Sequence, residues 1–281
     1  MCTATWNHPN GYPVKCGQCV ECRLAYSREW AIRITHEAQM RGPCCMLNLT
    51  YDDAHLPKFG QLVKSDLQKF FKRLRKNTGP FRYVAAGEYG DLRRRPHFHI
   101  ALFGLDFADT RHEWGAAING DRTYISSEVS KSWSLGGHVI GTLNFESAAY
   151  ISRYIMKKLK GPNASPVPLA CDPDSGELVM PNPEFLLCSK GIGKLWFQDY
   201  FMTDVYPHAS VVTSQGSKAP VPAYYKKLLK DIGSDLAFEM SVKSSMRSGS
   251  KPLSEEMPQR RLARATYNKS RTSLFARDTK D

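Results

Sequence analysis

Long apolar runs are absent from this sequence. Nowhere do its 281 residues form a stretch long and apolar enough to cross a bilayer as a helix. Residues 1–12 are polar and lack the pattern of a secretory signal peptide. These absences argue against an integral membrane protein and a secreted one, so we expect the chain to work in the cytoplasm without a membrane partner.

Acidic residues are also in short supply. The chain has 27 aspartate and glutamate residues against 39 lysine and arginine residues, which gives a formal net charge of +12. Such a charge favours a polyanionic partner, with nucleic acid ahead of a membrane surface. An unrelated basic enzyme would have the same charge, so the assignment depends on motifs. Apolar residues make up 42% of the chain, which is enough for a core.

Hydrophobic periodicity predicts alternating helices and strands. Leu67, Phe70, Phe71 and Leu74, for example, recur at helical spacing and form one apolar stripe. The order β-α-β-β-α-β, followed by a further helix, favours an α+β fold with a central antiparallel sheet flanked by helices. The expected helices cover residues 24–40, 66–76, 126–133 and 146–159, and the expected strands cover 44–51, 81–88, 96–103 and 138–145.

Composition predicts three regions along the chain. Residues 1–23 form a cysteine-rich extension, and residues 24–240 form the main domain. Within that domain, 161–183 is rich in proline, glycine and aspartate and is expected to be an exposed insertion. Residues 241–281 are basic and poor in large apolar side chains, so we expect a disordered tail.

Two histidines in a predicted strand form a candidate metal site. Strand alternation puts His97 and His99 on one face and Phe98 on the other, toward a core. Glu88 ends the preceding strand, and a hairpin would bring it beside the imidazoles. Two nitrogens and a carboxylate suit Mg²⁺ or Mn²⁺. The alternatives are two surface histidines and a salt bridge from Glu88 to an arginine of 93–95.

A predicted helix carries two tyrosines on one face. Tyr150 and Tyr154 are four residues apart, and Lys157 and Lys158 continue that face. A phenol has a pKa of about 10, so its phosphate ester stays reactive and a DNA 3′-hydroxyl can displace it again. Two such groups would allow two successive transfers. The alternative is a pair of amphipathic core tyrosines beside solvated lysines.

The third motif is a cluster of cysteines. Cys16, Cys19 and Cys22 have the spacing C-x₂-C-x₂-C, and Cys2 is a candidate for the fourth ligand that a structural Zn²⁺ site needs. Reduced free thiols and an iron–sulfur cluster are the alternatives. The other candidates for a fourth ligand are His8, His36, Cys44 and Cys45.

Taken together, these motifs resemble a known group of enzymes. The sequence resembles the HUH endonucleases, named for their His-hydrophobic-His strand, and within them the replication initiators of small single-stranded DNA phages of the microvirus type, particularly the gokushovirus branch. The resemblance spans roughly residues 1–230. It is carried by CGQCVECR at 16–23, YSREW at 26–30, LTYDD at 49–53, GEYG at 87–90, RPHFH at 95–99 and the paired tyrosines.

The resemblance implies the ferredoxin-like core order of that superfamily and a set of roles. His97 and His99 would be metal ligands with Glu88 as the third, and Tyr150 and Tyr154 would be nucleophiles. Lys157 would assist them, and Arg153 and Lys158 would contact DNA. The order in which the two tyrosines act stays open.

The implied function is the start of rolling-circle replication. The protein would nick single-stranded origin DNA through a 5′-phosphotyrosine intermediate, in the cytoplasm of a bacterial host, with the host helicase and polymerase as partners. One rival is a non-catalytic, zinc-dependent nucleic-acid-binding protein, which gives no reason for the histidine and tyrosine motifs. The other is a transposase or relaxase of the same superfamily, against which two tyrosines without an appended helicase argue.

Overall fold

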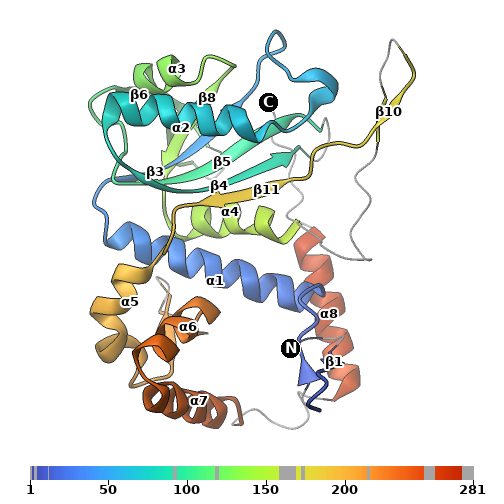
Figure 1. Cartoon of the computed structure of the whole chain (residues 1–281), viewed down its shortest axis with the longest axis vertical. Coiled ribbons are helices and arrows are strands. Elements are labelled where there is room, and N and C mark those ends of the chain that lie inside the picture. The colour runs from blue at the N-terminus through green and yellow to red at the C-terminus, as the bar shows by residue number, and fades with distance from the viewer. Residues whose placement is uncertain are drawn as a thin grey trace. The chain divides into compact units, whose positions relative to one another are not determined.

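The chain divides into two compact units. The computed structural model describes residues 2, 5–11, 13–90, 94–117, 120–157, 169–171, 175–213, 216–249 and 257–273. One unit combines Met1–Met40 with Gly193–Ala276, and the other combines Arg41–Ile192 with Arg277–Asp281 (Figure 1). Within the described residues, no helix has both the length and the apolar character that spanning a bilayer requires.

The second unit is built on a seven-stranded sheet in the order β11-β4-β5-β3-β8-β7-β6. All its neighbouring strands are antiparallel, so the predicted α+β class with a central antiparallel sheet is confirmed. The strands are β3 (Cys44–Thr50), β4 (Arg82–Tyr89), β5 (Pro96–Phe103), β6 (Arg111–Ala116), β7 (Arg122–Ser126), β8 (His138–Thr142) and β11 (Phe185–Cys188).

One face of this sheet packs into the main hydrophobic core. Helices α2 (Lys64–Thr78) and α3 (Ser127–Ser132) contribute to this core. The predicted apolar stripe of α2 is confirmed, because all four of its side chains are buried. Alternate residues of the central strands point the same way and join the core, among them Leu47, Leu49, Phe98 and Ile100.

Helix α4 (Phe145–Lys157) packs on the opposite face, against β4 and β5 (Figure 1). Its beginning is set by a reciprocal cap. The Ser147 N–H donates to Asn144 Oδ1, and the Asn144 N–H donates to Ser147 Oγ, each at 2.8 Å. Such a box satisfies N–H groups that the first turn of a helix leaves without partners. The predicted helix extended to residue 159, and residues 158–160 lie outside the described part of the chain.

Three strands of the sheet have no counterpart among the predicted elements. Strands β6 and β7 form a hairpin, and β6 lacks the apolar alternation that marks a strand, because its side chains are largely exposed. Strand β11 pairs with β4 from a position far along the chain. The short strands β9 (Ala170–Cys171) and β10 (Leu178–Val179) lie in the predicted insertion, most of whose first half is outside the described residues.

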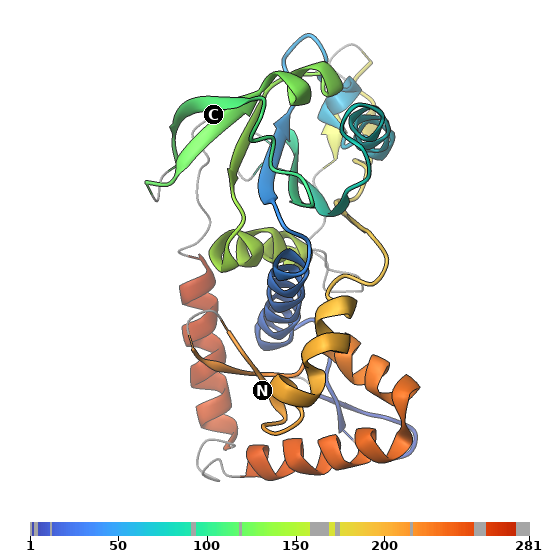
Figure 2. The same cartoon turned by 90° about the vertical axis from the view of Figure 1, so that its left-hand side faces the viewer.

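The first unit is mainly helical. Helix α1 (Val20–Gln39) packs against α5 (Lys194–Tyr200) and α8 (Pro258–Ser273), which flank it in Figure 2. The remaining elements of the unit are the hairpins β1 (Trp6–Asn7) with β2 (Pro13–Val14) and β12 (Ser210–Val212) with β13 (Lys218–Pro220), the π-helix η2 (Phe201–Val205), and helices α6 (Ala223–Ile232) and α7 (Ser234–Gly249). The other unit adds the 3₁₀ helix η1 (Lys58–Gly60).

The C-terminal region differs from its prediction. Helices α7 and α8 lie where the sequence predicted a disordered tail. Tertiary contacts account for them: α7 packs on α6, α8 packs on α1, and Asn268 Nδ2 donates to Glu21 Oε1 at 2.6 Å. The structure also groups α1 with the residues after Gly193, whereas the sequence predicted one domain over 24–240. Composition alone does not register such long-range pairing.

Candidate active site

Strand β5 lies between β4 and β3, and its register brings four polar side chains together. Glu88 on β4 is opposite His97, and Asn48 on β3 is opposite His99. Side chains at these positions share one face of the sheet, the face that helix α4 covers. Phe98 points into the core on the other face, as the alternation predicted.

The two imidazoles converge on one carboxylate. Oε1 of Glu88 lies 2.7 Å from Nε2 of His97 and 3.2 Å from Nε2 of His99. Glu88 is 2% exposed and His99 is 3% exposed, so neither is the surface group that the alternative interpretation required. Burial alone would raise the pKa of Glu88, but the hydrogen bonds from both histidines outweigh it and hold the pKa below its usual value.

The far nitrogen of each imidazole is held by an oxygen. Nδ1 of His97 lies 3.0 Å from the carbonyl oxygen of Arg95, and Nδ1 of His99 lies 2.7 Å from Oδ1 of Asn48. A carbonyl oxygen only accepts, so Nδ1 carries the proton in both rings. This arrangement directs both Nε2 atoms at Glu88 and is the one that metal-binding histidines use.

The donor set fits a divalent cation. With oxygen acceptors at both nitrogens, each ring makes all its hydrogen bonds only as an imidazolium. A single divalent cation between the Nε2 atoms and Glu88 would supply the same two positive charges. The ligand atoms lie within 4.8 Å of one another. Oε2 of Glu88 is buried without a hydrogen-bond partner, which is costly unless a cation or donor meets it.

The predicted alternative partner for Glu88 is not observed in the described residues. Arg95 bonds to the Tyr51 carbonyl and pairs with Asp53 at 2.7 Å, and the Arg94 guanidinium lies over the Tyr89 ring. Arg93 lies outside the described residues. The carboxylate is therefore paired with the two histidines.

Helix α4 places a tyrosine against this cluster. The ring centroid of Tyr150 lies 5.1 Å from that of His99, and the two planes are nearly perpendicular at 85°. Tyr150 is partly buried, so its ring is neither a surface group nor a core residue. The side chains of Arg153, Tyr154 and Lys157 are outside the described part of α4, and Lys158 is outside it altogether.

Sequence reasoning missed Asn48. It is a polar residue between two leucines of a predicted strand, and this alternation indicates that its side chain lies on the opposite face from the core. What the sequence does not indicate is its neighbour, because β3 and β5 are far apart along the chain. The pairing of the two strands is what brings Asn48 to His99.

The structure also brings Cys2, Cys16, Cys19 and Cys22 together in the first unit. Cys2, the preferred fourth member, is in place. The other candidates are engaged elsewhere. His36 is stacked on Trp196, Cys44 and Cys45 bond to the carbonyls of Gly42 and Leu105, and His8 accepts the Asn10 N–H.

Comparison with known proteins points to one group. A family model for the replication-associated protein ORF2 and related proteins matches residues 44–159, which include all three candidate metal ligands and both tyrosines. Replication-associated protein VP4 of Bdellovibrio phage phiMH2K is 32% identical over 242 residues, 83% of this chain and 72% of its own length. Replication-associated protein ORF2 of Spiroplasma virus 4 is 33% identical over 231 residues, 77% and 68% of the two chains. Replication-associated protein ORF4 of Chlamydia phage 1 is 26% identical over 245 residues, 84% and 58% of the two chains. No solved structure matches the chain.

Proposed function

Because this chain belongs to the family of phage replication-associated proteins, we propose that it starts rolling-circle replication as a DNA endonuclease and strand transferase. The relatives confirm the resemblance to microvirus-type initiators found in the sequence. The observation that carries the enzymatic part of the proposal is the cluster of Glu88, His97 and His99 with the Tyr150 ring against it. A protein that only binds DNA has no use for this arrangement.

The proposed reaction is a transfer of DNA from its own 3′ oxygen to a tyrosine. The phenol oxygen of Tyr150 or Tyr154 bonds to the scissile phosphorus and loses its proton. The bond from phosphorus to the 3′ oxygen breaks, and that oxygen takes up a proton to become a free 3′-hydroxyl. The DNA 5′ end stays on the tyrosine. Because the ester retains the reactivity of the phosphate, a later 3′-hydroxyl can reverse the step.

The metal cluster would align the phosphate for this attack. When bound, Mg²⁺ or Mn²⁺ would polarise the phosphoryl group and offset its developing charge. Glu88, His97 and His99 would hold it with positions left open, and imidazole ligands suit Mn²⁺ better. Asn48 and the Arg95 carbonyl would fix both rings so that their Nε2 atoms face the ion.

Two tyrosines would allow the reaction to run twice. The first would nick the origin and leave a 3′-hydroxyl for a host polymerase, while a host helicase separates the strands. The second would cut the regenerated origin, and the new 3′-hydroxyl would close the displaced circle. Lys157 would favour the phenolate, and Arg153 and Lys158 would contact the DNA. All of these steps would take place in the cytoplasm of the bacterial host.

The test is the covalent adduct. Full-length protein is incubated with labelled single-stranded origin DNA and Mn²⁺ or Mg²⁺, and the products are separated under denaturing conditions. We expect an adduct with the wild type, reduced amounts with Tyr150→Phe or Tyr154→Phe, and none with the double variant. Phenylalanine keeps the ring and removes only the nucleophilic oxygen. Tyr200→Phe, an exposed tyrosine of the other unit, is the control that should not change the yield.

Two outcomes would overturn the proposal. An adduct from the double variant would mean that the nucleophile is another residue, with Tyr51, Tyr83 and Tyr89 next to test. Near-normal cleavage by a His97→Ala, His99→Ala double variant would remove the metal site. That variant should retain DNA binding, since Lys and Arg contacts to phosphates supply most of it.

A further inference from the structure

Four cysteine side chains cluster where helix α1 begins, away from the sheet and its site. Cys16 and Cys19 belong to the turn before the helix, and Cys22 is in its first turn. Cys2 and Cys16 flank the open end of the β1–β2 hairpin, and Cys2 and Cys22 are buried. We propose that these four thiols bind one Zn²⁺ ion, which fastens the N-terminal hairpin to α1. This inference does not depend on the proposed nicking reaction.

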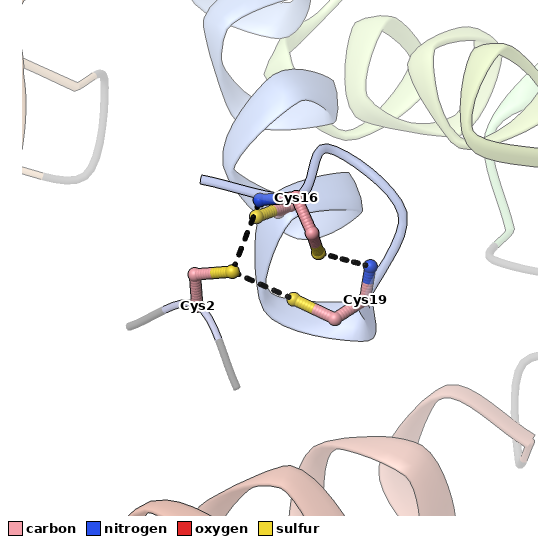
Figure 3. Close-up of side chains that lie close together, drawn as sticks. Cys2, Cys16 and Cys19 are labelled. Atoms are coloured by element: carbon pink, nitrogen blue, oxygen red, sulfur yellow. Dashed lines mark hydrogen bonds between the residues drawn. The ribbon is translucent and has the colours of Figure 1, made fainter. Parts of the chain in front are cut away.

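The spacing of the sulfur atoms fits one tetrahedral ion. All four Sγ atoms lie within 4.8 Å of one another, and those of Cys2 and Cys19 are 3.9 Å apart (Figure 3). A tetrahedral site with Zn–S bonds of about 2.3 Å places its sulfurs about 3.8 Å apart. A disulfide needs about 2.05 Å. In a four-iron cluster each thiolate binds a different iron, which requires a wider arrangement.

Backbone N–H groups already point at the sulfurs. The N–H groups of Gln18 and Cys19 donate to Cys16 Sγ at 3.4 and 3.2 Å, and that of Cys16 donates to Cys2 Sγ at 3.2 Å. Hydrogen bonds of this kind favour the thiolate form that a metal needs and orient the ligand. Gly17 has a φ of +72°, a conformation that glycine adopts without strain. The turn is therefore preorganised around Cys16.

The surroundings compensate the charge of a filled site. Zn²⁺ with four thiolates carries two negative charges, and it would sit at the N-terminus of α1, where the helix dipole favours negative charge. Arg23 follows Cys22 directly, and its Nε is buried without a hydrogen-bond partner. A negatively charged cluster beside it would offset a cation that is otherwise only partly compensated. Among divalent ions, Zn²⁺ also binds such sites more tightly than Fe²⁺.

A bound ion would explain how the hairpin persists. Its two strands have two residues each, and so short a hairpin is not stable by itself in water. The cluster closes the chain from Cys2 to Cys22 around this hairpin. The ion would thereby hold the hairpin, including the exposed Trp6 side chain, on the end of α1.

The test is metal analysis of the full chain, purified without chelator. We expect about one zinc per chain, and the His97→Ala, His99→Ala double variant should retain it, which separates this site from the nicking site. Cys16→Ser should lose most of the zinc. Cys2→His should keep it, because three cysteines and a histidine also form zinc sites. Cys188→Ser, on exposed β11, is the control and should keep it as well.

A second measurement does not depend on how the variants fold. Titration of the metal-free wild type with Co²⁺ should give the intense thiolate charge-transfer absorption and visible bands of a tetrahedral site, with saturation at one equivalent. Absence of those bands, iron in place of zinc, or an active folded chain with no metal would each overturn the proposal.

Discussion

Asn48 carries no charge, yet it sets the proton position of a site histidine. Its Oδ1 accepts from Nδ1 of His99 at 2.7 Å, which leaves Nε2 directed at Glu88. The backbone carbonyl of Arg95 does the same for His97. Only the first of these two acceptors belongs to a side chain, so only Asn48 can be removed without moving the main chain.

We predict that Asn48→Ala weakens Mn²⁺ binding by about 10- to 100-fold, the effect typical of losing a partner that orients a ligand. The free His99 ring would populate orientations that do not bind metal. Isothermal titration of the full chain with Mn²⁺ measures the change. Asn77→Ala is the matched control, because Asn77 bonds to Glu128 at an exposed position away from the histidines. Equal affinity of the Asn48 variant and the wild type would show that strand packing alone orients His99.

The site residues differ in how far the sequence predicts them. His97, His99 and Glu88 could be found because alternation and a short hairpin place them in one locality. Tyr150 followed from helical spacing, although its contact with His99 did not. Asn48 lies 51 positions from its partner, and no local pattern indicates that β3 and β5 are neighbours.

His36 makes the first unit sensitive to acid. Its ring stacks on Trp196 at 3.4 Å and pairs with the Tyr225 hydroxyl at 2.9 Å. Burial lowers the pKa of His36 to about 3, against about 6.5 in an unfolded chain. Below pH 6.5 the unfolded chain therefore binds a proton that the folded chain does not, so stability that is complete above pH 6.5 is lost as the pH falls toward 3.

We predict that His36→Gln flattens this dependence. In the wild type, His36 should lower the unfolding free energy by up to about 1.4 kcal/mol per pH unit between pH 6 and pH 4. Urea unfolding at several pH values measures the slope, which should fall by about one proton in the variant. His208→Gln, on the surface of the same unit, should leave the slope as it is. An unchanged slope for His36→Gln would mean that the ring accepts its proton in the folded state.

At the scale of elements, the end of strand β3 depends on a close approach of two chain segments. The N–H of Thr50 donates to the Gly137 carbonyl, and that of Asp52 donates to the Leu135 carbonyl, each at 3.0 Å. Gly136 lies between these two bonds with a φ of +155°. A Cβ atom there would overlap the backbone of Thr50 and Asp52. Backbone atoms have no alternative rotamer, so only glycine fits.

We predict that Gly136→Ala lowers the unfolding free energy by more than about 1 kcal/mol, because the new methyl group would push the turn away from β3. Urea denaturation measures the loss. Gly141→Ala on β8 is the matched control, since a Cβ at that position has open space around it, and its effect should be small. Similar losses for both variants would point to glycine flexibility in the unfolded chain as the cause.

The elements that the sequence predicted share one property, which is that their own residues decide them. Helix α2 has a four-residue apolar stripe, and β5 alternates along its length. Strand β6 is different, because its polar side chains are exposed and only its pairing with β7 makes it a strand. Helix α8 is polar too, and its contact with α1 is not visible in composition. Local patterns therefore predicted the centre of the sheet and missed its edges.

For the whole molecule, the excess of positive charge is unevenly distributed. Helix α8 has five basic residues and no acidic residue in its sequence, and most of its side chains are exposed. Helix α2 is also basic, but it covers the sheet face opposite to the histidine cluster. DNA held at the histidines lies on the other side of the sheet from these lysines. Net charge alone therefore does not say which basic groups bind.

We predict that exposed charges of α8 contact DNA phosphates and that those of α2 do not. Each phosphate contact to single-stranded DNA contributes about −0.7 to the slope of log affinity against log salt concentration. Arg260→Gln with Lys269→Gln should reduce the slope by about 1.4, measured by fluorescence anisotropy across a salt series. Lys72→Gln with Lys76→Gln removes the same charge from α2 and should leave the slope unchanged. If both pairs reduce it equally, affinity follows net charge and no particular surface; if only the α2 pair reduces it, the DNA crosses the face that this structure assigns to the core helices.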